Sequence, residues 1–375
     1  MLTQNNKISM RQFQLLLILD IFGVGVMTLP RRAAVFAGAD GWLCVLAAGL
    51  IAVFVSLIYS SIVKMFPGDS FARYSSKILS KPVGSIICLL FSVKLILTCA
   101  LELRIFGEIL RQTILIKTPY AVIAAVMLSP CVYLAAKGFE ARGRMAEILI
   151  FAVIVPIAAV FAASAGDIDF SNLKPVFAAE PEALVKGSFE AVSAFTGLEL
   201  CLVALPFVRS KGDIKKGAAA VTALVGVMFA AVTCLTVARF GAADTGRMQF
   251  PVLELMNAAD LPGSFIEKQD ALVMGFYILS AFAAVNAYLF FAGMTAGDFI
   301  NGSGRSENGR GRPSLRLAAV AAIVFLLSFI PEDMTRAYDF KMIMFRTFGT
   351  AFFAVIPAVL LVTAKIRGLG KRRNG

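Results

Sequence analysis

The first long apolar run of the chain, residues 12–30, reads QFQLLLILDIFGVGVMTLP and predicts a membrane-spanning helix. A helix rises 1.5 Å per residue, so about 20 apolar residues cross the roughly 30 Å hydrocarbon core of a bilayer. The apolar part of this run, Gln12 to Leu29, is longer than a signal-peptide core, and Pro30, Arg31 and Arg32 follow it instead of a small-residue cleavage site. We therefore expect a retained span.

Apolar runs of similar length recur along the whole chain. The 375 residues are 59% hydrophobic and 16% charged, and their mean hydropathy of +0.81 exceeds what one water-soluble core usually hides. We expect an all-α integral membrane protein, with residues 1–375 forming one transmembrane domain. Its ten predicted spans are residues 12–30, 41–66, 82–110, 119–137, 143–164, 186–207, 215–239, 266–297, 314–331 and 337–364.

The basic residues predict the orientation of these spans. The formal charge is +12, but the Lys and Arg residues form short clusters between apolar runs and lack the interleaved aromatic side chains typical of nucleic-acid binding. About twice as many of them fall in connections on one side of the predicted membrane as on the other. Both termini are therefore expected in the cytoplasm, which agrees with an even number of spans.

Ten spans divide into two repeats of five, residues 1–164 and 186–364. Because five is odd, the second repeat inserts upside down relative to the first, which permits an inverted repeat. The first span of each repeat carries an interruption, FGVG at 22–25 and FTGLE at 195–199. Short or interrupted spans in corresponding positions of two repeats point to a binding site.

Gly23, Val24, Gly25, Thr196 and Gly197 are the ligand-binding candidates at these interruptions. Glycine weakens a helix and lets a ligand approach the backbone closely. The freed N-terminus of a half-helix attracts a carboxylate, and freed carbonyls attract an ammonium or a cation. An α-amino acid carries both groups. The alternative is that the glycines only allow close helix packing.

Charged side chains inside a span cost about 2.5 to 3.5 kcal/mol at its centre and need a partner or water. Asp20 is a candidate ion or proton site, or it pairs with a lysine such as Lys94. Glu102 is a candidate for the polar wall of a ligand cavity. The i, i+4 spacing of Arg104 and Glu108 predicts a structural ion pair.

Glu199 and Asn286 complete the candidate site. Glu199 follows the second interruption, where it either binds a ligand ammonium or caps the restarting half-helix. Asn286 and Tyr288 offer neutral hydrogen-bonding groups to a ligand or to neighbouring helices. The chain contains no histidine, no metal-binding cysteine spacing and no motif of a catalytic nucleophile with its base. We therefore expect no enzyme, no cofactor and no metal site.

Seven segments together resemble the B subunit of bacterial spore germinant receptors, the spore germination permease family. They are FGVGVMTLPR, FPGDSFARYSSKILSKPVG, LELRIFGEIL, DIDFSNLKPV, FTGLELCLVALPFV, FIEKQDALVM and SFIPEDMTRAYD. The match follows the family's order and spacing over nearly the whole chain. Many relatives have Glu-Arg-x-Asp where this chain has residues 267–270, EKQD. The basic position is kept as Lys268, which lacks the planar fork of arginine.

The resemblance implies a fold, a location and partners. The fold is that of the amino acid, polyamine and organocation superfamily, a LeuT-like five-plus-five inverted repeat with broken helices 1 and 6. Family members sense nutrient germinants, often amino acids, in the spore inner membrane, together with an A subunit and a lipoprotein C subunit. The family's ligand site corresponds to Gly23, Gly25, Thr196 and Gly197, with facing residues of the third and eighth spans.

The sequence leaves three functions open. The first is a germinant receptor subunit that binds an amino-acid-like nutrient and signals to its partner subunits. The second is a secondary amino-acid transporter in the cell membrane, coupled to protons or sodium. The third is a water or ion conduit within the receptor complex.

Overall fold

The computed structural model of the chain describes residues 7–22, 25–164, 168–209, 213–257, 269–301 and 313–369. Their backbone forms helices and connecting segments, with one isolated β-bridge between Ile8 and Val208. Gly23 and Val24, two of the predicted ligand residues, lie outside the described ranges.

The first half of the chain consists of a pair of short helices followed by longer ones. The helices are α1 (Met10–Phe22), α2 (Gly25–Ala37), the 3₁₀ turn η1 (Gly38–Asp40), α3 (Gly41–Met65), α4 (Phe71–Ile78), α5 (Lys81–Thr113), α6 (Tyr120–Ala136) and α7 (Phe139–Ser164).

The second half contains two helical runs that change their hydrogen-bonding type along the way. The first run is α8 (Pro181–Val192), the 3₁₀ segment η4 (Ser193–Leu200), α9 (Cys201–Ala204) and η5 (Leu205–Phe207). The second run is α15 (Met334–Met344), the π-helical segments η7 (Phe345–Gly349) and η8 (Ala351–Val355), and α16 (Ile356–Ile366). The other elements are η3 (Phe170–Leu173), α10 (Ile214–Phe240), α11 (Ala242–Arg247), α12 (Pro251–Asn257), α13 (Gln269–Asn301) and α14 (Pro313–Leu327).

Six helical runs among the described residues are long and apolar enough to cross a membrane. They are Gly25–Met65, Lys81–Thr113, Pro181–Phe207, Ile214–Phe240, Met274–Ile300 and Met334–Ile366, and Tyr120–Ala136 and Leu315–Leu327 are shorter apolar helices. Such runs satisfy their own backbone groups in lipid. The chain is therefore a multi-pass helical membrane protein.

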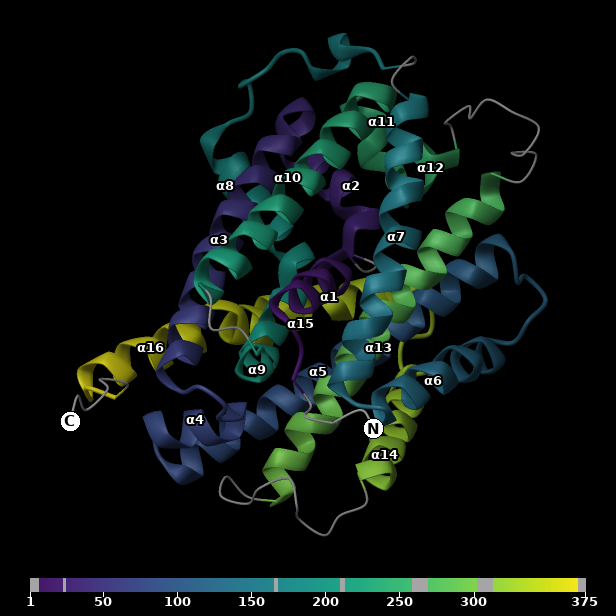
Figure 1. Cartoon of the computed structure of the whole chain (residues 1–375). Coiled ribbons are helices and arrows are strands. Elements are labelled where there is room, and N and C mark those ends of the chain that lie inside the picture. Colours follow the sequence, from purple (N-terminus) through teal and green to yellow (C-terminus); the bar gives the residue numbers. More distant parts are fainter. Residues whose placement is uncertain are drawn as a thin grey trace.

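α1 lies at the centre of the bundle. Every side chain from Leu16 to Phe22 is buried, as expected for a stretch that is apolar on all sides except at Asp20. α3, α8 and α10 pack together on one side of α1, and α5, α6, α13 and α14 pack together on the other (Figure 1). α3 and α10 approach closely at Gly49 and Gly226, where a Cβ on either glycine would lie 3.1 Å from the Cα of the other. Such small residues let helix backbones pack closely in a membrane.

Polar contacts join the elements at the two ends of the bundle. The Asp40 carboxylate accepts hydrogen bonds from the backbone N–H groups of Phe177, Ala178 and Ala179 at 2.7 to 2.9 Å. These bonds hold the segment before α8 near α11, at the top of Figure 1. At the other end, Lys64 donates to Asp213 at 2.9 Å and thereby lowers the pKa of the Asp213 carboxyl.

Candidate functional site

The two sequence interruptions lie against each other in the structure. A Cβ added at Gly197 would lie 2.3 Å from the carbonyl oxygen of Asp20 and 2.7 Å from its carbonyl carbon. Real Cβ atoms do not approach backbone so closely, so η4 can contact α1 here only through a glycine. Gly25, at the start of α2, lies across from Ala194, where an added Cβ would make an ordinary contact of 3.5 Å.

The second interruption is a tighter helix rather than an unwound segment. η4 has 3₁₀ hydrogen bonding over Ser193–Leu200 and passes directly into α9. A 3₁₀ stretch within a longer helix often marks a functional hinge. The first interruption lies between Phe22, where α1 ends, and Gly25, where α2 begins.

A small central cavity lies where α1, α2, η4, α5, α13 and α15 meet. Its volume is about 10 Å³, which leaves room for about one water molecule. The lining residues are Asp20, Ile21, Gly25, Glu102, Ala194, Thr196, Gly197, Ala284, Tyr288 and Lys341. The structure thus brings together five candidate residues predicted from the sequence: Asp20, Gly25, Glu102, Thr196 and Gly197.

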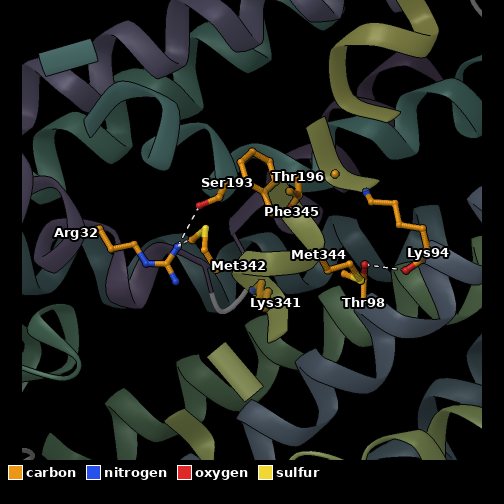
Figure 2. Close-up of a pocket in the computed structure, with 10 residues that line it drawn as sticks. Arg32, Lys94, Thr98, Ser193, Thr196, Lys341, Met342, Met344 and Phe345 are labelled. Carbon is orange, nitrogen blue, oxygen red and sulfur yellow. Dashed lines mark hydrogen bonds between the residues drawn. The ribbon is translucent and has the colours of Figure 1, made fainter. Parts of the chain in front are cut away.

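A second cavity, of about 20 Å³, shares Thr196 and Lys341 with the central one. Figure 2 shows Arg32 on one side of it, directed toward Ser193 and Met342, and Lys94 beside Thr98 on the other side. The Arg32 guanidinium donates to the Ser193 hydroxyl at 3.2 Å, which links α2 to η4. The remaining lining residues are Met344, Phe345 and Gly349.

Asp20 forms a buried ion pair with Arg142 at the start of α7. Nε of Arg142 also donates to Oδ1 of Asn286 at 3.1 Å, and Nδ2 of Asn286 donates to the backbone oxygen of Cys131 at 2.9 Å. The partner of Asp20 is therefore an arginine and not Lys94. Asn286 braces α6, α7 and α13, and it does not line the central cavity.

Glu199 pairs with Lys94, which joins η4 to α5. Both side chains are almost fully buried, and Oε1 of Glu199 has no hydrogen-bond partner within the described ranges. The predicted pair of Arg104 and Glu108 is confirmed, at 3.0 Å. Arg104 also donates to the backbone oxygen of Glu332 at 2.6 Å, just before α15.

Glu102 faces a lysine that sequence reasoning missed. Nζ of Lys341, on α15, lies 2.6 Å from Oε1 of Glu102. Oε2 of Glu102 is buried and unpartnered among the residues that the structure describes. Lys341 and Arg142 are both distant in sequence from their partners. The available sequence signal for Lys341 and Arg142 was their position, because a basic residue inside or beside an apolar run needs an acidic partner.

The central cavity therefore combines one half-paired carboxylate, the hydroxyls of Thr196 and Tyr288, and backbone at two glycines. These groups suit a small molecule with an ammonium group, because a carboxylate oxygen accepts charge-assisted hydrogen bonds. Over the described part of the chain, no group of three or more His, Cys, Asp or Glu side chains could hold a metal ion.

Fold and site together define a multi-pass helical membrane protein with a polar cavity beside its central helix. The family model described as "Spore germination protein" matches residues 7–337, and the chain belongs to this family of spore germination proteins.

Three curated relatives illustrate the match, all from Bacillus subtilis. The chain is 22% identical to spore germination protein YndE, over 99% of this chain and 100% of the relative. It is 22% identical to spore germination protein B2, over 95% and 94%. It is 26% identical to spore germination protein KB, over 76% of each chain.

We predict that Gly197→Ala disrupts the contact between η4 and α1. The added methyl group would meet the Asp20 carbonyl at 2.3 Å, so the backbones must separate, at a cost of about 1 to 3 kcal/mol. The unfolding temperature of the detergent-purified variant should fall by several degrees. The control is Gly275→Ala in α13, which meets nothing within 4 Å. Equal unfolding temperatures for the two variants would contradict the contact.

Arg142→Gln should destabilise the protein much more than Arg144→Gln. Removing Arg142 leaves Asp20 buried and unpaired, which costs about 3 to 5 kcal/mol. Arg144 forms a partly exposed i, i+4 pair with Glu140 at 2.6 Å, a type worth about 0.3 to 0.5 kcal/mol. Thermal unfolding of the two purified variants checks the difference, and a comparable small loss in both would show that the Asp20 pair is dispensable.

Proposed function

We propose that this protein is a membrane-embedded germinant receptor subunit that binds a small nutrient with an ammonium group, above all an amino acid. The observation that carries the proposal is the central cavity, where residues from both interruptions meet Glu102. Membership in the spore germination family supports the biological role.

In this proposal the chain crosses the membrane ten times, as two inverted repeats of five spans. α1 with α2, and α8 through η5, are the discontinuous first spans of the two repeats. Both termini lie in the cytoplasm, in accord with the bias of Lys and Arg between spans. The contact of Gly197 with α1 supports this arrangement, because ligand sites of inverted-repeat transporters lie at the repeat interface.

The bound nutrient presents its ammonium to Glu102, whose Oε2 is unpartnered in the described structure. α2 begins at Gly25, and the first N–H groups of a helix lack intrahelical partners and attract a carboxylate. A cavity of about 10 Å³ holds about one water molecule. Binding an amino acid therefore requires the cavity walls to move, and this movement is the signal passed to partner subunits.

A transporter coupled to protons or sodium is the alternative within the same fold. Its candidate coupling group is Asp20, which is already paired with Arg142. A guanidinium remains protonated at all relevant pH values, so Asp20 needs no inorganic cation to neutralise it. This observation favours sensing over cation-coupled transport.

A water or ion conduit is the other candidate function. Three cavities that share lining residues favour it. A third cavity of about 10 Å³ shares Asp20 with the central cavity, which in turn shares Thr196 and Lys341 with the second. Each has room for about one water molecule. A pure conduit requires no nutrient in the central cavity, so ligand binding separates it from the receptor.

The partners in this proposal are a germinant receptor A subunit and a lipoprotein C subunit, in the spore inner membrane. The family resemblance supports them. In this proposal, the A and C subunits receive the germination signal through the same movement of the cavity walls.

We predict that one or a few of the twenty amino acids raise the unfolding temperature of the detergent-purified protein, and that Gly25→Ala abolishes or redirects this effect. Gly25 lines the central cavity, and the contact of the added methyl group with Ala194 is an ordinary 3.5 Å, so the ligand-free variant should remain stable. Binding stabilises by about 2.7 kcal/mol at 100 times Kd.

The matched control for this experiment is Gly275→Ala, the same substitution in open space on α13. It should respond to amino acids as the wild type does. Absence of stabilisation by any amino acid, or an unchanged response of Gly25→Ala, would count against an amino-acid site in the central cavity.

A further inference from the structure

Lys341 reaches from α15 into the interior, between the two cavities that it lines. Its side chain is 15% exposed, and that of its partner Glu102 is 5% exposed. A buried charge needs a partner because desolvation is costly. In the ligand-free protein Lys341 and Glu102 therefore balance each other's charge, and together they carry no net charge.

The pair is incomplete on the side of Glu102. An ionised carboxylate offers about four lone-pair sites on two oxygens, and Oε2 has no hydrogen-bond partner within the described ranges. Glu102 itself lines the central cavity. A second donor can therefore reach Glu102 from the cavity.

Charge balance decides which ligand can enter. A lone ammonium would add one uncompensated positive charge beside the neutral Lys341–Glu102 pair, and a buried unpaired charge is strongly unfavourable. A zwitterion adds no net charge. Its ammonium can pair with Glu102 while its carboxylate pairs with Lys341, so that every charged group has a partner of opposite charge.

We propose that an α-amino acid inserts into the Glu102–Lys341 pair and exchanges partners with it, which makes Lys341 the residue that selects for a free carboxylate. This inference rests on the proposed function and names the substrate class of the same site. The inserted ligand would separate Lys341, on α15, from Glu102, on α5. The helix that moves on binding is therefore α15.

The surroundings of α15 suit such a movement. Among the eleven residues of α15, only Met334 and Ala337 are buried. α15 continues into the π-helical segments η7 and η8, and π-bulges are frequent at functional sites. Nε of Arg346, in η7, donates to Glu190 at 3.1 Å, so a shift of α15 is transmitted to α8.

The test measures the affinity of detergent-purified protein for the twenty L-amino acids and for their α-amides, which keep the ammonium but lack the carboxylate. Wild type should prefer each effective amino acid over its amide. Lys341→Met should weaken amino-acid binding by about 10- to 100-fold, the usual worth of a hydrogen bond to a charged group. The amide should bind Lys341→Met at least as well as wild type, because Glu102 is then free.

Two further variants separate selection from a structural role. Lys341→Arg keeps the positive charge and should retain the preference for the acid. The double variant Glu102→Gln with Lys341→Met removes both charges, so that neither is left buried without its partner. It should bind neither the amino acid nor its amide. This double variant also serves if Lys341→Met alone fails to fold.

The outcomes distinguish this inference from the proposed function. Wild-type binding with an unchanged preference for acid over amide in Lys341→Met overturns the role of Lys341 and leaves the nutrient site intact. Failure of every amino acid and amide to bind wild type overturns the proposed function, and the inference with it.

Discussion

Buried charge is the constraint on which this structure depends. Asp20 lies buried on the central helix α1 among mainly apolar side chains, and its carboxylate is tolerated because Arg142 faces it. Arg142 in turn binds Asn286, so one ion pair fixes α1 against α7 and α13. Further pairs act in the same way between α5 and η4, and between α5 and α15.

These pairs, together with one glycine, also shape the central cavity. Gly197 brings η4 onto the backbone of α1, while Glu102 and Lys341 enter the space beside that contact from α5 and α15. Packing alone would fill this space with apolar side chains. The charges keep this space polar and place it between elements that ion pairs hold together.

The sequence predicted features that depend on neighbouring residues. Apolar runs located the long helices but not the short helices α4, α11 and α12, and the i, i+4 spacing of Arg104 and Glu108 predicted their ion pair. Sequence spacing does not reveal contacts between distant segments, so Arg142 and Lys341 were missed as partners. The glycine pattern indicated where η4 and α1 meet, but not that η4 remains helical. Ligand binding by the cavity residues remains a prediction.

The most direct test of the account is a structure of the purified protein determined with a stabilising amino acid. The account predicts the amino acid between α1, η4 and α5, with its ammonium at hydrogen-bonding distance from Glu102 and the central cavity enlarged to contain it. An amino acid bound elsewhere on the protein, with Glu102 still paired only to Lys341, would contradict it.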